Sequence, residues 1–232
     1  MIEARKTYQG QLEKLDKAIL KMGVFVEEAL HKAITALIEE DCDMAEAIIF
    51  EDEKINTLEI EVEDICIALI ATNHPVAGDL RHIITSMKIA SQLERMGDHA
   101  VHIAKNVIRL KEKYISRLLN SIPREGEIVI RMLHEVISAY VKKDVEKAME
   151  IAKMDKEVDE LHYDNSKKII ELMLSEKEYV KPGAGFLFID RFFERLGDHI
   201  VIICEWIVYS VTNEHRELNE KESIWHRERY SS

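Results

Sequence analysis

The stretch ERMGDH at residues 94–99 returns as ERLGDH at residues 194–199, one hundred positions further along the chain. Each copy holds a Glu and an Asp four positions apart, which is the spacing of neighbours on one face of an α-helix. Repetition of a motif at such a distance predicts two copies of one structural unit. The sequence therefore indicates a duplicated helical scaffold that carries an acid pair at the same place in each half.

Apolar residues recur at three- and four-residue intervals through most of the chain, which is typical of amphipathic helices. In the first half we expect one helix over residues 2–40. A second helix should begin with a capping box at Asp43 and Glu46 and end at residues 74–75. The third should then follow as far as residue 113, so that three helices fill the first half.

The same pattern restarts after residues 114–124, the one stretch that resembles a linker. We expect helices over residues 125–143, from the cap Asp144 to residue 176, and over residues 182–212. Three prolines and eight glycines in 232 residues also favour long helices over many short strands. The predicted fold class is all-α, with two tandem antiparallel three-helix bundles related by internal duplication.

The predicted domains follow this duplication. Residues 1–118 form the first three-helix bundle and residues 119–212 form the second. Residues 213–232 form a polar C-terminal tail, which we expect to be frayed or lightly docked.

The composition excludes several classes of protein. A formal charge of −12, with Lys and Arg interleaved among the acids, argues against nucleic acid and an anionic membrane surface as partners. The three cysteines are far apart and form no CxxC pair, which indicates buried thiols rather than a disulfide framework or a zinc ribbon. Because the sequence shows no signal core and no apolar run long enough for a bilayer, we expect a cytoplasmic protein without membrane insertion.

The acids of the repeated motif fall on the helix face opposite the apolar stripe. On a helical wheel Glu94 and Asp98 point almost directly away from the predicted core, with His102 one turn further on. If the second and third helices form an antiparallel hairpin, Asp52 lies as far before the turn as residue 96 lies after it. We therefore expect Asp52 to lie level with Glu94 and Asp98 on an open outer face.

The second half repeats this arrangement. A turn near Glu176 places Asp155 level with residue 197, between Glu194 and Asp198. The candidate metal-binding residues are Asp52, Asn56, Glu94, Asp98 and His102 in the first half, and Asp155, Asp159, Glu194 and Asp198 in the second half.

Clustered carboxylates raise one another's pKa, and a divalent or trivalent cation relieves their repulsion. Hard oxygen ligands suit Mg, Mn and Fe, whereas an added imidazole from His102 favours Zn or Fe at the first site. The identity of the metal stays open among Fe, Zn, Mn and Mg. The alternative is a solvated acidic stripe that Arg95 and Arg195 neutralise.

No enzyme motif accompanies these acids. The sequence holds no P-loop, no GxGxxG, no GxSxG and no paired Cys and His. Its one Glu-x-x-His, at Glu28 and His31, falls short of the two that a ferritin-like di-iron site requires. We predict a non-enzyme without catalytic residues, and the alternative is a carboxylate-bridged iron enzyme or a metal-handling helical protein. His99 and His199 are interpreted as packing or hydrogen-bonding residues between helices.

The doubled ERxGDH motif, the segments around Asp52 and Asp155, and PVAGDLR at residues 75–81 together resemble the PhoU family over residues 2–212. The resemblance implies two tandem three-helix bundles and a negative regulator of phosphate uptake and of the phosphate-starvation response. It also implies a non-catalytic adaptor between the ATPase subunit of a phosphate ABC transporter and a membrane sensor histidine kinase. We further expect a homodimer.

Some members of this family carry metal clusters at E(D)xxxD motifs, which match Glu94 with Asp98 and Glu194 with Asp198. The chain departs from the family pattern at three positions. Asn56 stands where Asp is usual, and His102 and Ile202 stand where Asn is common. The resemblance therefore implies two metal sites that differ in composition.

Overall fold

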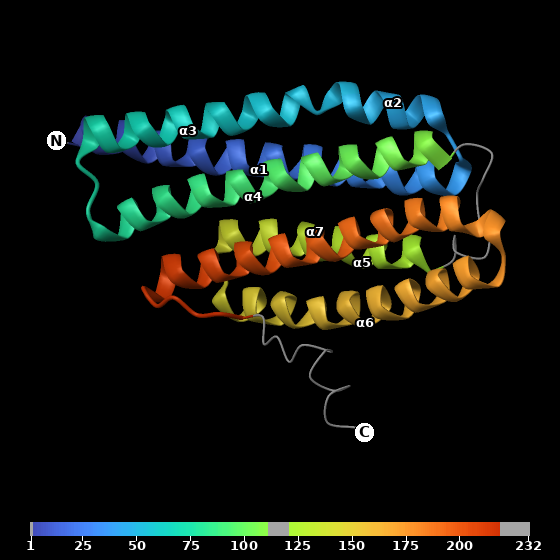
Figure 1. Ribbon diagram of the computed structural model, residues 1–232. Helices are drawn as coiled ribbons and strands as arrows, with labels where there is room; N and C mark the ends of the chain where they lie inside the picture. The colour runs from blue at the N-terminus through green and yellow to red at the C-terminus, as the bar shows by residue number, and fades with distance from the viewer. Residues whose placement is uncertain (1, 111–120, 219–232) are drawn as a thin grey trace.

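The computed structural model describes residues 2–110 and 121–218, and every regular element within them is helical. The first half consists of α1 (Ile2–Glu39), α2 (Cys42–Glu51), α3 (Glu53–Asn73) and α4 (Ala77–Leu110). The second half consists of α5 (Ile122–Lys142), α6 (Val145–Ser175), the short 3₁₀ helix η2 (Lys177–Tyr179) and α7 (Val180–Thr212). Figure 1 shows the two halves side by side, with all the long helices along one direction. The predicted all-α, duplicated fold is confirmed.

Matching aspartates begin the second helical stretch of each half. Asp41 Oδ1 accepts a hydrogen bond from the Met44 N–H at 2.9 Å, and Asp144 Oδ1 accepts one from the Lys147 N–H at 2.9 Å. Both caps have extended backbone angles, as N-cap residues do. The predicted cap at Asp43 is therefore wrong, because Asp43 already lies in the first turn of α2.

The second predicted helix is interrupted at Asp52. Helix α2 ends at Glu51, and α3 continues in nearly the same direction from Glu53 (Figure 1). The Ile55 N–H donates to the Asp52 carbonyl oxygen at 2.8 Å, which is a tight three-residue turn. Asp155, at the matching position of the second half, lies inside the unbroken α6. The two halves therefore differ in backbone at their corresponding aspartates.

Two predicted boundaries in the second half move toward the N-terminus. Helix α5 begins at Ile122 instead of residue 125, because Pro123 suits the first turn of a helix. Helix α7 begins at Val180 instead of residue 182. Residues 114–120 of the predicted linker lie outside the described residues. Its last three residues, 122–124, belong to the start of α5.

One continuous apolar core joins the two halves. Helix α4 packs against α7, and α1 packs against α5, so that each half covers an apolar face of the other. A Cβ atom on Gly23 of α1 would lie 2.9 Å from Ile137 of α5, and one on Gly126 of α5 would meet Ile34 of α1. Tyr140 of α5 also donates a hydrogen bond to Asp16 at 2.9 Å. This close packing fixes the two copies of the repeated motif relative to each other.

The beginning of the predicted tail docks on α7. The Leu218 N–H donates to Glu205 Oε1 at 2.9 Å, and the His215 ring stacks on Tyr209 with ring centroids 4.0 Å apart. The remainder of the tail lies outside the described residues. Of the helices described, none has the length and apolar character that crossing a lipid bilayer demands.

Candidate functional site

The first acidic cluster forms where α2 and α3 meet α4. A Cβ atom on Gly97 would lie 2.9 Å from Ile55 Cδ1 and 3.4 Å from Asp52 Oδ1. Glycine at this position of the motif therefore allows the aspartate to lie directly against α4. Asp52 reaches the level of residue 97, between Glu94 and Asp98, as the count of residues along the hairpin predicts.

Burial and mutual repulsion shift the titration of this cluster. The pKa of Glu94 is raised by burial first, and then by the charges of Asp98, Glu59 and Asp52. The pKa of Asp52 is raised by burial and by Asp98, although Asn56 acts in the opposite direction. Each carboxylate thus makes the ionised form of its neighbours less favourable, which is the electrostatic condition that a bound cation relieves.

Glu59 also belongs to this cluster, although it is not among the metal-binding residues predicted from the sequence. Its pKa is raised by burial and then by Glu63, with a smaller effect of Asp98, and its charge acts on Glu94 in turn. Glu59 lies two helical turns beyond Asp52 on α3. That spacing is the signal that identifies it as a further acid on the same face.

The second cluster lies in the contact between α6 and α7. An oxygen of Asp155 occupies the space that a Cβ atom on Gly197 would need, so the same glycine position again admits an aspartate. Asp155 is 3% exposed. Glu194 has a 14% exposed side chain and forms an ion pair with Arg191 at 2.9 Å. The prediction of an open outer face is therefore wrong for these acids, because the close approach of the helices covers them.

Glu194 stands at the centre of the second cluster. Its pKa is raised by burial and by the charge of Asp198, and further by Asp159, while Arg191 and His162 oppose the shift. The structure thus brings Glu194, Asp198 and Asp159 into electrostatic contact, with Asp155 one helical turn before Asp159 on α6. The four acids predicted for the second half gather at one place.

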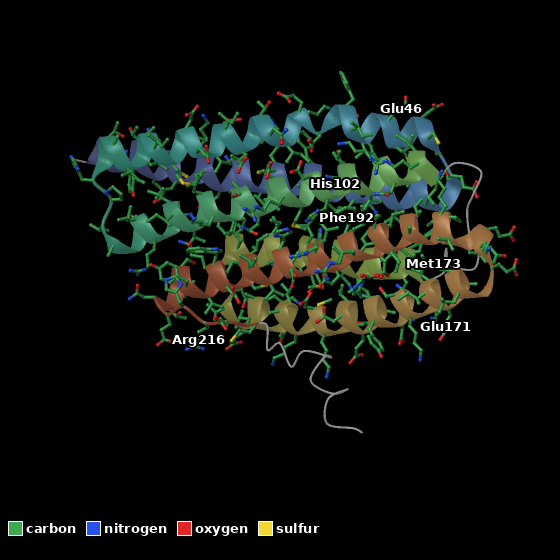
Figure 2. The ribbon with its side chains drawn as sticks, viewed as in Figure 1. Glu46, His102, Glu171, Met173, Phe192 and Arg216 are labelled. Carbon is green, nitrogen blue, oxygen red and sulfur yellow. The ribbon has the colours of Figure 1, made fainter. Side chains whose placement is uncertain are left out.

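His102 projects toward the other half of the molecule. Its ring stacks on Phe192 of α7 with ring centroids 5.0 Å apart, and Figure 2 shows the two labelled side chains between the halves. Asp98 lies one turn before His102 on the same helix, so the imidazole stays at the margin of the first cluster. Its predicted role as a metal ligand remains a prediction.

The two copies of the motif meet through their histidines. His99 Nε2 and His199 Nε2 lie 3.2 Å apart, and His199 Nδ1 lies 2.8 Å from Gln92 Oε1. Because an amide oxygen only accepts, His199 Nδ1 carries the proton, and its Nε2 accepts from His99. Burial lowers the pKa of both rings to about 4, so both are neutral at pH 7. The prediction of hydrogen bonding between helices is confirmed.

The donor atoms of both clusters suit a metal cation. Asp52 Oδ1, Asn56 Oδ1 and Glu194 Oε2 are buried without a hydrogen-bond partner among the described residues. Oxygen ligands of this kind coordinate Mg, Mn and Fe. The residues present therefore fit the cation that the acid pairs predict.

Comparison with known protein families matches residues 19–107 and 122–207 to the PhoU domain, so that each half of the structure carries one match. Among curated proteins, the chain is 36% identical over 217 residues to the phosphate-specific transport system accessory protein PhoU homolog of Clostridium acetobutylicum, covering 93% of this chain and 99% of that protein. It is 32% identical over 204 residues to the phosphate-specific transport system accessory protein PhoU of Escherichia coli, covering 88% of this chain and 85% of that protein.

Two solved structures share the architecture. The phosphate transport system regulatory protein PhoU from Streptococcus pneumoniae superposes with a TM-score of 0.85 at 36% identity, covering 90% of this chain and 99% of that one. PhoU from Pseudomonas aeruginosa superposes with a TM-score of 0.86 at 30% identity, covering 89% of this chain and 100% of that one.

Proposed function

Since this chain belongs to the PhoU family, we propose that it is an accessory protein of a phosphate-specific transport system and a negative regulator of phosphate uptake. The observation that carries the proposal is the match of both halves to the PhoU domain, together with relatives that are named accessory or regulatory proteins of phosphate transport. The alignment spans nearly the full length of both chains, so the likeness covers the whole architecture.

The proposed mode of action is that of a cytoplasmic, non-catalytic adaptor. One surface would contact the ATPase subunit of the phosphate transporter and another a membrane sensor histidine kinase. Two helical halves that share a single core give a rigid body that can hold two partners at a fixed separation. A homodimer is part of the proposal, and sedimentation velocity tests it.

Metal ions at the two acidic clusters complete the proposal. Asp52, Asn56, Glu94 and Asp98 would hold a cation in the first half, and Asp155, Asp159, Glu194 and Asp198 would hold one in the second. The cation would supply positive charge that neutralises the acids. The side chains themselves tie α3 to α4 and α6 to α7, so occupancy would stiffen the contact between the helices of each hairpin.

The regulatory proposal is tested in a strain that lacks the chain. With phosphate in excess, deletion should leave the response regulator phosphorylated and phosphate uptake high, and restoring the full chain should lower both. A deletion strain that still silences the response in excess phosphate would contradict the proposal. Within residues 2–110 and 121–218, the groups that gather at the clusters are mainly carboxylates, which repel an anion, so we propose that phosphate is not bound directly. Tight phosphate binding in calorimetry would contradict that part.

A further inference from the structure

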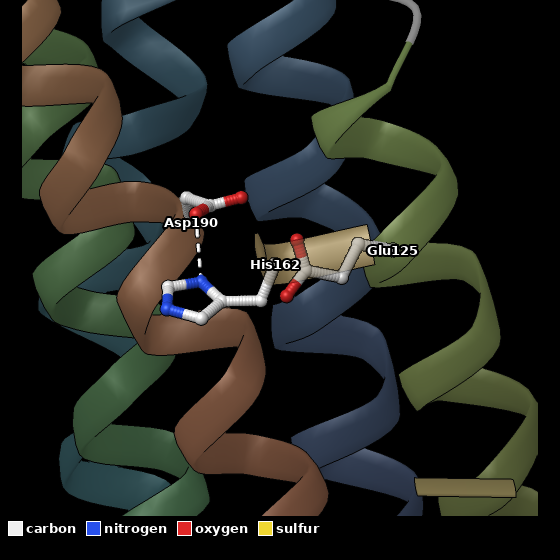
Figure 3. A group of neighbouring side chains, drawn as sticks. All are labelled: Glu125, His162 and Asp190. Atoms are coloured by element: carbon white, nitrogen blue, oxygen red, sulfur yellow. Dashed lines mark ion pairs between the residues drawn. The ribbon is translucent and has the colours of Figure 1, made fainter. Parts of the chain in front are cut away.

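Three polar side chains from three different helices converge inside the second half. Glu125 of α5, His162 of α6 and Asp190 of α7 each place one ligand atom within 4.8 Å of the others (Figure 3). Glu125 and Asp190 are 0% exposed, and the His162 side chain is 22% exposed. We call these three residues the buried triad. They are distinct from the residues of the two acidic clusters.

The hydrogen bonds around the buried triad leave several oxygens unsatisfied. Asn165 donates to Glu125 Oε2 at 3.2 Å, and Ser166 donates to Asp190 Oδ2 at 3.1 Å. His162 Nδ1 lies 2.7 Å from the same Asp190 oxygen. Glu125 Oε1, Asp190 Oδ1 and Asn165 Oδ1 are buried and have no hydrogen-bond partner among the described residues. All three are acceptors, so the group lacks a positive charge or a set of donors.

The electrostatics show the same deficit. Burial, followed by the neighbouring Asp190, raises the pKa of Glu125 to about 11. Burial acts to lower the pKa of His162, but its bond to Asp190 outweighs that effect and raises it. Two buried carboxyl groups in contact are costly unless a proton or a cation compensates them. A proton on Glu125 relieves one charge and can be donated to Asp190, whereas a divalent cation would compensate both carboxylates and would also coordinate the free Asn165 oxygen.

The first half shows that the fold does not need the two acids of the buried triad. The caps Asp41 and Asp144 align the second helical stretch of each half, and the same offset matches Met22 to Glu125. The repeated motif matches Ala90 to Asp190. Met22 and Ala90 are both 0% exposed, so the first half has buried apolar residues in place of Glu125 and Asp190. The offset of the caps matches His162 to Glu59. The acids of the second half are therefore an addition to a scaffold that packs without them.

We propose that Glu125, His162 and Asp190 bind a divalent transition-metal ion, with Zn²⁺ as the reference case, in the interior of the second half. Carboxylate oxygens combined with an imidazole nitrogen are the ligands of Zn and Fe, whereas Mg and Ca prefer oxygen alone. Asn165 Oδ1 supplies a further oxygen at the same place. His162 is the one member of the triad with a partly exposed side chain, so we expect the ion to enter from its side.

The site is tested with Co²⁺ and Zn²⁺ on the full chain after removal of metal. The acid pairs of the repeated motif are first neutralised with Glu94→Gln, Asp98→Asn, Glu194→Gln and Asp198→Asn, so that these pairs no longer compete with the buried triad for metal. This background should bind one equivalent of Co²⁺ with visible d–d absorption, and Zn²⁺ should displace it. Failure of this background to bind either ion, while it remains folded by circular dichroism, would overturn the proposal.

The matched variant carries Glu125→Met and Asp190→Ala in the same background. These substitutions introduce the residue types that the first half has at the matching positions, Met22 and Ala90. Binding should weaken at least about tenfold, since loss of even an outer-shell partner costs that much in metal affinity. His162→Gln should weaken binding and alter the Co²⁺ spectrum while the protein stays folded. Equal affinity in the parent background and the Met and Ala variant would overturn the proposal. If that variant does not fold, Glu125→Gln, which preserves the volume, gives the same comparison.

Discussion

An oxygen of Asp155 occupies the space that a Cβ atom on Gly197 would need. The contact ties α6 to α7 at the centre of the repeated motif. Gly197→Ala should therefore destabilise the chain by about 1–3 kcal/mol, the usual cost of overpacking a tight contact. Equilibrium unfolding in urea measures the change.

Gly78→Ala is the matched control for this substitution, because nothing lies within 4 Å of a Cβ atom at that position. Gly78 also lies in a helix, so the substitution should be neutral or should stabilise the chain by up to about 1 kcal/mol. Gly97→Ala should fall between the two, because its nearest neighbour is the flexible end of Ile55. Equal effects at Gly197 and Gly78 would show that the aspartate contact does not constrain the motif.

The contact between His99 and His199 predicts a loss of stability in acid. Both rings have a folded-state pKa of about 4, lowered by burial and by nearby positive groups that include Arg195. In the unfolded chain they take up protons near the ordinary value of about 6.5. The unfolded state therefore binds more protons between these values, and stability present above pH 6.5 is lost as the pH falls toward 4.

The measurement compares urea unfolding at pH 7 and pH 5 for the parent and for the double variant His99→Gln, His199→Gln. The parent should lose more stability than the variant, by at most about 2 kcal/mol for each ring, since about 1.5 pH units lie between the ordinary pKa and pH 5 and each corresponds to about 1.4 kcal/mol. The parent and the variant are compared because acids with raised pKa values, such as Glu94 and Glu194, make the folded state more stable as the pH falls. That effect is common to both proteins and cancels in the difference between them. Parallel pH profiles would contradict the neutral pair.

The repulsion at Glu94 predicts that metal reverses the effect of a substitution. Without metal, Glu94→Gln should raise the unfolding temperature at pH 7, because burial and the neighbouring acids Asp98 and Glu59 oppose ionisation of Glu94. With saturating Mn²⁺ the unfolding temperature of the parent should rise more than that of the variant, since the variant has lost a ligand. Thermal unfolding in EDTA and in Mn²⁺ tests both expectations. For a chain of this size, a change of about 1 kcal/mol in stability shifts the unfolding temperature by about 2–4 °C. If Mn²⁺ raises the unfolding temperature of the variant as much as that of the parent, Glu94 is not a ligand of the ion.

The cap at Asp41 predicts a contrast with its neighbour Asp43. Asp41→Ala should cost about 1 kcal/mol, because it removes the acceptor for the Met44 N–H. Asp144→Ala should cost a similar amount in the second half. Asp43→Ala removes only a charge in the first turn and should cost less. Chemical denaturation of the three variants orders them, and a larger loss at Asp43 would contradict the observed cap.

Much of the fold follows from the sequence because it depends on local periodicity. The apolar stripes, the duplicated motif and the count of residues from each turn are enough to predict six helical stretches and the level of Asp52 against residue 97. The backbone break at Asp52 does not follow, since Asp155 has the same environment in the pattern yet lies in an unbroken helix. The choice between Asp41 and Asp43 as cap also depends on backbone angles that the pattern does not specify.

The candidate sites are harder to predict, because they depend on how helices pack. A wheel for one helix treats Glu194 as an outer residue, but the glycine contact brings α6 close enough to cover it. The buried triad joins residues from three helices that no spacing rule connects. Its one sequence signal is the exchange of Met22 and Ala90 for acids at the matching positions of the second half.

Metal content of the purified full chain tests the central claim, that the repeated motif builds two cation sites in a regulatory scaffold. Elemental mass spectrometry would compare the parent with the quadruple variant Glu94→Ala, Asp98→Ala, Glu194→Ala, Asp198→Ala. Both proteins would first be reloaded with Fe, Mn, Zn or Mg. We expect ions at both clusters of the parent, and loss of those ions from a folded variant that keeps at most the one ion of the buried triad. Equal metal content in the two proteins, or none in the reloaded parent, would contradict it.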